Sequence, residues 1–163
     1  MTVKILDQAQ HKAVTRAKFS LTKASEFTAE FRQKLLNLFS QHHALDAWGV
    51  EFELDQNSLG ANIRTPFGSA RAVAVNAIVN SKAQIRYVIE KAVTLEDGRS
   101  GHVKIAAVCI DENGVITSED GTNQLADLNS LYDSESNQAA GEIGLSIVHS
   151  IGVEERYLAP PHD

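Results

Sequence analysis

The feature that most constrains the fold is a stripe of large apolar residues within SEFTAEFRQKLLNLFSQ. The stripe consists of Phe27, Phe31, Leu35, Leu38 and Phe39. Its three- and four-residue spacing is that of one face of an amphipathic helix. Because phenylalanine dominates this face, we expect the helix to pack on a β-sheet. Ser25 is the expected N-cap, with Thr22 as the alternative, and residues 7–18 are expected to form a second, weaker helix.

Downstream, the chain changes to strand-like segments separated by turn sequences. VEFEL alternates apolar and acidic residues, and it is followed by LGANIR, ARAVAVNAIV, AQIRYVIEKAV, HVKIAAVCI and VITS. The separators DQNS, TPFG, TLEDGRSG and DENG have turn chemistry, and such short connections favour antiparallel neighbours. We therefore expect an α+β fold: an N-terminal helix packed on an antiparallel meander of five or six strands, then one or two C-terminal helices. Residues 1–163 are expected to form a single domain.

The hairpin predicted around Gly98 has apolar residues on both of its faces. Strict alternation places these residues on one face: Ile85, Tyr87, Ile89, Val93, Val103, Ile105, Ala107 and Cys109. The opposite face mixes Arg86, Glu90 and Lys104 with further apolar residues. A solvent-facing sheet normally carries a more polar row. We expect this second face to be half covered, either by a C-terminal segment or by a second subunit.

The C-terminal part of the sequence is predicted to be mainly helical. Thr122 or Asn123 is placed to cap a short helix whose apolar residues are Leu125, Leu128, Leu131 and Tyr132. Residues 138–151 fit either a helix or a strand. Two glycines there weaken a helix by about 1 kcal/mol each relative to alanine. We favour the helix.

The charges are distributed very unevenly along the chain. The formal net charge is −6. Residues 1–25 contain five Lys or Arg and one acid, residues 111–163 contain one Arg and eleven acids, and residues 105–155 contain no Lys or Arg. The acidic end is explained by solvation, by pairing with the basic N-terminal arm within or between chains, or by a basic partner. Phosphate binding needs a concentrated basic patch, so nucleic acid is not expected as the main ligand.

These charges lead to the functional hypothesis that we prefer on sequence grounds. The protein is expected to be a non-catalytic cytoplasmic binding protein whose acidic C-terminal third meets a basic protein partner or another subunit; a homo-oligomer is one form of this. The candidate partner-binding residues are Glu119, Asp120, Asp127, Asp133 and Glu135. Whether the protein also catalyses a reaction is left open, because no complete catalytic set is found.

The alternative hypothesis is a small-molecule-binding or simple hydrolase domain with a pocket between the helix and a curved sheet. Its candidate polar residues are His42, Asp46, Arg64 and Tyr87. His42 and Asp46 share a helix face if the helix continues, as an acid–base pair would require, but a solvated helix end is the explanation that we prefer for them. The chain contains no P-loop, no G-x-G-x-x-G and no G-x-S-x-G motif.

The single cysteine limits the covalent and metal chemistry of the chain. Cys109 excludes an internal disulfide and a zinc site built on several thiolates. A buried free thiol fits a reducing compartment, which is the basis for expecting a cytoplasmic location. DENG at Asp111 begins like a calcium-binding loop, but Val115 and Ile116 follow, and a hairpin turn is expected instead. No apolar run reaches the roughly 18 residues of a membrane helix. We therefore expect no cofactor, metal or membrane partner.

Overall fold

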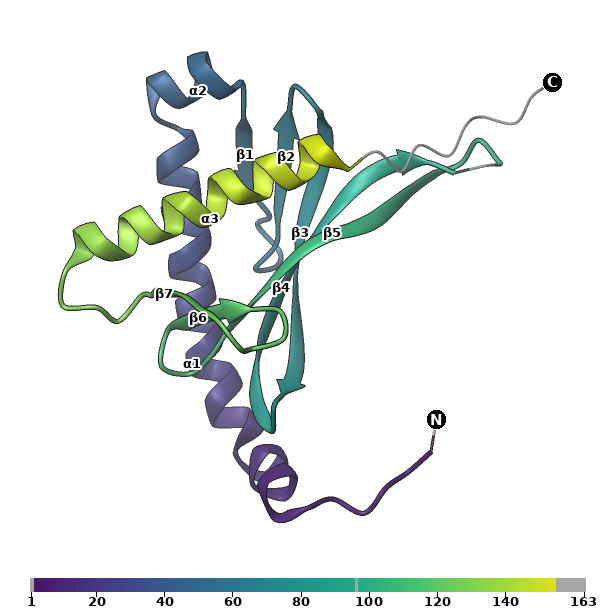
Figure 1. The fold of residues 1–163 in the computed structure, drawn as a ribbon, viewed down its shortest axis with the longest axis vertical. Coiled ribbons are helices and arrows are strands. Elements are labelled where there is room, and N and C mark those ends of the chain that lie inside the picture. The colour runs from purple at the N-terminus through teal and green to yellow at the C-terminus, as the bar shows by residue number, and fades with distance from the viewer. Residues whose placement is uncertain (1, 96, 155–163) are drawn as a thin grey trace.

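The computed structural model of the chain describes residues 2–95 and 97–154. These residues form three helices and seven strands (Figure 1): α1 (Gln8–Phe39), α2 (His42–Trp48), β1 (Glu51–Leu54), β2 (Ala61–Thr65), β3 (Gly68–Val79), β4 (Lys82–Thr94), β5 (Ser100–Ile110), β6 (Val115–Ser118), β7 (Gln124–Asp127) and α3 (Asp133–Val153). Figure 1 shows α1 running along the sheet and α3 crossing α1. The predicted α+β class is confirmed.

Helix α1 is one continuous helix, because its cap lies at Asp7 rather than at Ser25. The Asp7 side chain accepts from the Gln10 backbone N–H at 2.8 Å, and the Gln10 side chain accepts from the Asp7 N–H at 2.9 Å. This reciprocal capping box satisfies two N–H groups at the start of the helix. The hydroxyls of Thr22 and Ser25 instead donate to carbonyls four residues earlier, inside the helix. The predicted N-caps and the separate helix over residues 7–18 are therefore wrong.

The strands form one antiparallel sheet in sequence order, β1 to β7. The predicted meander is confirmed, but seven strands replace the expected five or six. The additional strand is β7, which lies where a helix with Leu125, Leu128 and Leu131 was predicted. Leu128 is buried whereas Leu131 is almost fully exposed, so the leucines do not form one helical face. Residues 138–151 belong to α3, which makes α3 the one C-terminal helix of the described residues.

The core lies between the sheet and the phenylalanine stripe of α1. Phe31 meets Tyr87 of β4 edge-to-face, with ring centroids 5.8 Å apart. Phe39 packs against Phe52 of β1, with centroids 5.9 Å apart. Phe31, Leu35, Phe39 and Tyr87 are all buried. The stripe therefore has the partner that its composition predicts.

A β-bulge changes the predicted face of β5. Strand β4 pairs Ile89 with Ala106 but Glu90 with Lys104, which leaves Ile105 as the extra residue. One extra residue reverses the alternation of side chains beyond it. Tyr87 consequently pairs with Val108, and Ala107 and Cys109 lie on the face opposite to the one predicted.

The second face of the sheet is partly covered by the β6–β7 loop. The Cys109 thiol, which is buried, donates to the Glu119 carbonyl at 3.5 Å. The Asn80 side chain donates to the Asp120 carbonyl at 2.8 Å. The backbone at Glu119 and Asp120 therefore covers part of this face, while Val75 of β3 stays 43% exposed. Among the described residues, no helix has both the length and the apolar character that crossing a membrane requires.

Candidate functional site

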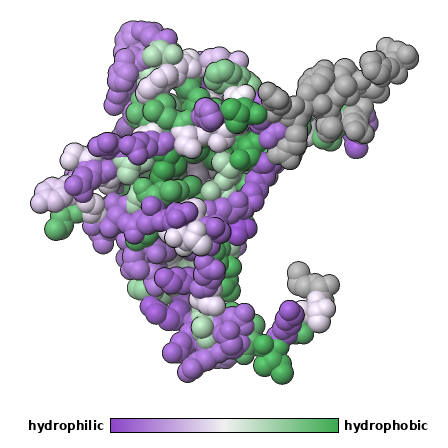
Figure 2. Space-filling view, viewed as in Figure 1, coloured by the Kyte–Doolittle hydropathy of each residue, from purple (hydrophilic) through white to green (hydrophobic). Residues whose placement is uncertain are grey.

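A groove of about 310 Å³ lies between α3 and strands β5, β6 and β7. We call it the α3 groove. Its apolar walls are formed by Ala106, Val108, Leu125, Ala139, Ile143 and Ile147, and its polar rim by Ser118, Glu119, Glu142 and Ser146. Figure 2 shows hydrophobic surface between α3 and the β6–β7 region, with hydrophilic residues around it.

The groove exists because α3 packs tightly on α1 and more loosely on the sheet. A side-chain carbon at Gly144 would lie 3.0 Å from Leu35 Cδ2 and 3.2 Å from Phe39 Cζ, so glycine permits the close approach of the two helices. On the sheet side, β5 presents the small Ala106 to the groove. Small side chains facing a helix leave space that larger ones would fill.

The rim of the groove is acidic. Glu119 forms an ion pair with Lys104, while Glu142 on α3 is exposed and accepts from the Gln138 amide at 3.5 Å. Because residues 105–155 contain no Lys or Arg, Lys104 is the nearest fixed cation in sequence to this region. The arrangement offers apolar area with negative charge beside it.

The other acidic residues predicted to bind a partner serve the local backbone. Asp120 accepts from the Ser118 hydroxyl at 2.6 Å and from the Thr122 N–H and hydroxyl at 3.0 and 2.8 Å. These hydrogen bonds lower the pKa of Asp120 to about 2, and the one from the Ser118 hydroxyl has the largest effect. Asp127 accepts from the Asn129 N–H at 2.9 Å, and Asp133 and Glu135 lie in the first turn of α3, where carboxylates favour the helix dipole.

The four pocket candidates do not come together. His42 and Asp46 form an exposed pair, Nδ1 to Oδ2 2.9 Å, on the short helix α2. Arg64 on β2 pairs with Glu51 of the neighbouring strand at 2.8 Å. Tyr87 is buried in the core, and its hydroxyl has no hydrogen-bond partner among the described residues. Burial raises the pKa of Tyr87, with the Arg32 charge opposing the shift.

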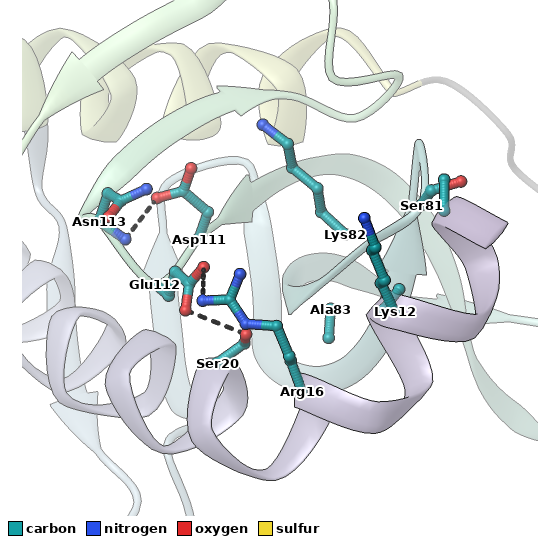
Figure 3. A pocket seen from close by; sticks show the side chains of 11 residues that line it. Lys12, Arg16, Ser20, Ser81, Lys82, Ala83, Asp111, Glu112 and Asn113 are labelled. Carbon is teal, nitrogen blue, oxygen red and sulfur yellow. Dashed lines mark hydrogen bonds and ion pairs between the residues drawn. The ribbon is translucent and has the colours of Figure 1, made fainter.

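A second recess, of about 290 Å³, lies between the N-terminal half of α1 and the start of β4. In Figure 3, Arg16 turns toward Glu112, at 3.7 Å, and the Ser20 hydroxyl donates to the same carboxylate at 3.0 Å. The amines of Lys12 and Lys82 extend away from that pair. Neither lysine makes an ion pair with another residue that the structure describes.

Sequence reasoning missed both recesses for the same reason. Lys12 and Lys82 lie on different elements, and so do Ala106, Leu125 and Glu142. Only the acidic run gave a signal for the α3 groove. Pairing residues so distant in the chain requires the register of the sheet and the crossing of α3 over α1.

The described residues do not assemble a metal site or a reactive thiol. Among them, no group of three or more His, Cys, Asp or Glu is placed to hold a metal ion. Burial raises the pKa of Cys109, and the nearby Arg86 opposes that shift, so the thiol lacks the thiolate character of a nucleophile. No family model, curated protein or solved structure matches the chain.

Proposed function

We propose that the protein is a non-catalytic binding module whose α3 groove receives a segment of a basic protein partner. That segment presents an apolar side chain to the groove and lysine or arginine to its rim. The observation that carries the proposal is the combination of apolar walls with the rim carboxylates of Glu119, which is paired with Lys104, and Glu142, in a stretch of sequence (residues 105–155) that contains no Lys or Arg.

The apolar walls and the acidic rim of the groove contribute to such binding in different ways. Full burial of one leucine-sized side chain of the partner contributes about 1.5–3 kcal/mol. In the groove, that side chain would pack against Val108, Ile143 and Ile147. The carboxylates favour partners of opposite charge and accelerate their encounter, an effect that salt screens. Affinity should therefore fall with ionic strength without disappearing.

Fluorescence anisotropy with a labelled peptide of alternating leucine and lysine tests the proposal. A matched peptide of alternating leucine and glutamate serves as the reference, and we expect it to bind at least about tenfold more weakly. Glu142→Lys should weaken binding of the lysine peptide by a similar factor. Glu26→Lys is the matched control, because Glu26 is an exposed carboxylate on α1, away from the groove, and forms an ion pair with Lys23 at 3.2 Å.

A steric variant distinguishes binding in the α3 groove from non-specific attraction to the acidic surface. Ser146→Trp places an indole on the groove rim without changing charge, since Ser146 is exposed, and should abolish binding. If Glu142→Lys and Glu26→Lys weaken binding equally, or if Ser146→Trp leaves it unchanged, the α3 groove is not the site.

The recess of Figure 3 favours a second candidate function, the binding of a small anion. Lys12 and Lys82 extend over it from α1 and β4, and ammonium groups bind phosphate or carboxylate oxygens. Thermal shift with pyrophosphate and with citrate tests this function. A rise in Tm that Lys82→Ala removes and Lys23→Ala keeps would support it, and no shift with either anion would contradict it.

A further inference from the structure

The two halves of β3 have different neighbours. Residues 68–72 pair with β2 on one side, and residues 70–72 also pair with β4 on the other. Residues 73–79 pair with β4 alone, and no other described residue continues the sheet beside them. Figure 1 shows this lower half of β3 at the margin of the ribbon, below the β1–β2 hairpin.

The backbone of this half is oriented for pairing with another strand. A side-chain carbon at Gly60 would lie 2.6 Å from the Ala72 carbonyl oxygen, so that carbonyl points toward β2 and away from β4. Alternate residues of a strand direct their N–H and C=O groups to the same side. Ala74, Asn76 and Ile78 therefore present theirs to the open edge.

Sheet edges are normally protected against association by charged residues, proline or a bulge. Residues 72–81 contain no charged residue and no proline, and the β3–β4 register contains no bulge. Val75 and Ile78 are 43% and 51% exposed. Figure 2 shows hydrophobic surface along the margin where this part of β3 runs.

Space for an added strand exists beyond Ala61, the first residue of β2. A recess of about 450 Å³ lies beside Ala72, Ala74 and Asn76, bounded by the β1–β2 loop. Arg32 of α1 fixes that loop by donating to the carbonyls of Asp55, Ser58 and Gly60 at 2.8–3.0 Å. The β1–β2 loop, held by Arg32, thus closes one end of the open edge. A strand added along this edge would have to end at that loop.

We propose that residues 73–79 form a dimer interface by antiparallel pairing with the same residues of a second copy of the chain. A twofold axis at Asn76 opposes Asn76 to Asn76 of the second copy. On either side it opposes apolar residues to apolar residues: Ala74 to Ile78, Val75 to Ala77, and Val73 to Val79. A twofold contact needs such a self-complementary surface. The side-chain amides of the two facing Asn76 residues can exchange hydrogen bonds, which would fix the register.

The near-symmetric sequence of residues 73–79 about Asn76, apolar on both sides, favours a second copy of the chain at this edge. Two chains of net charge −6 repel each other, and a stable contact between them needs an uncharged strip, which residues 72–81 supply. This interface uses neither the α3 groove nor the recess of Figure 3, so it does not depend on the proposed function.

Charge complementation at Asn76 tests the dimer. Sedimentation velocity of the wild-type chain should give twice the chain mass. Asn76→Lys and Asn76→Asp each place like charges directly opposite each other, and each should sediment as a monomer. An equimolar mixture of the two variants should return to the dimer mass as a heterodimer, because opposite charges then face one another.

Asn37→Lys, an exposed asparagine on α1, is the matched control and should remain dimeric. Circular dichroism melts establish that all variants are folded, as expected for an exposed side chain. A wild-type chain that is monomeric at every concentration overturns the proposal. So does a dimer that survives Asn76→Lys, or a Lys/Asp mixture that stays monomeric.

Discussion

Beneath α1 the sheet is covered by large aromatic and branched side chains, whereas the surface beside α3 is lined by alanine and aliphatic residues, none aromatic, with carboxylates around them. Phe31, Leu35, Phe39 and Tyr87 leave almost no exposed area. The α3 groove keeps about 310 Å³ open. The first region accounts for stability and the second leaves room for a partner, and this difference can be tested by substitution.

The largest expected effect is the loss of an aromatic ring from the first region. Phe31 is fully buried, and Phe31→Ala removes both its burial and its edge contact with Tyr87. We expect the free energy of unfolding to fall by about 3–5 kcal/mol in urea denaturation. Phe19 lies on the same helix but is 59% exposed, and Phe19→Ala should change it by less than about 0.5 kcal/mol. Equal effects would contradict the assignment of the core.

The contact between the two regions gives the next effect. Leucine at Gly144 would overlap Leu35 and Phe39 of α1, and Gly144→Leu should lower the unfolding free energy by about 1–3 kcal/mol. At Gly141 an added carbon would make ordinary contacts of 3.9–4.0 Å with Leu38. Gly141→Ala should therefore raise it by up to about 1 kcal/mol through helix propensity. Guanidinium denaturation of both variants decides whether α3 packs on α1 through Gly144.

A smaller effect of opposite sign is expected at Tyr87. Its buried hydroxyl has no hydrogen-bond partner among the residues described, and an unsatisfied buried polar group is destabilising. Tyr87→Phe should raise the free energy of unfolding by about 1 kcal/mol. A marked loss of stability would mean that the hydroxyl has a structural role, and Tyr87 would again be a candidate for the site.

The smallest effect is the pH dependence contributed by Asp120. Its pKa is lowered from 3.8 to about 2 in the folded chain. The ionised form therefore stabilises the fold above the unfolded pKa, and this stabilisation is lost as the pH falls from about 4 toward 2. Asp120→Ala should lower Tm slightly at pH 7, and the difference from wild type should shrink over that interval. A difference that is constant down to pH 2 would contradict this role.

The same contrast explains how much of the fold the sequence predicts. The phenylalanine stripe predicts α1 and its sheet because large side chains at fixed spacing define one face. The Asp7–Gln10 capping box also has a sequence signal, because Asp-x-x-Gln precedes the helical pattern. Thr22 and Ser25 are competing N-cap candidates nearer the phenylalanine stripe. Their hydroxyls have a competing bond to the helix backbone, and sequence does not decide between the two.

Errors elsewhere come from features that have no local signal. The bulge at Ile105 reverses the faces of β5, but residues 105–110 are all apolar, so the sequence has no alternation there that could reveal it. Leu125, Leu128 and Leu131 have helical spacing, but only Leu125 lies in β7, which forms a hairpin with β6. The open edge of β3 depends on where β2 begins, at Ala61, and the α3 groove depends on how α3 crosses α1, and both are decided by tertiary packing.

Chemical-shift mapping by NMR tests the central claim most directly. The isotope-labelled chain is titrated with the leucine–lysine peptide at low salt, and backbone amide shifts are followed. The account predicts that the largest changes fall on residues 139–147 of α3 and on residues 118–125. Changes centred instead on the N-terminal half of α1, or spread evenly over exposed acidic residues, would contradict it.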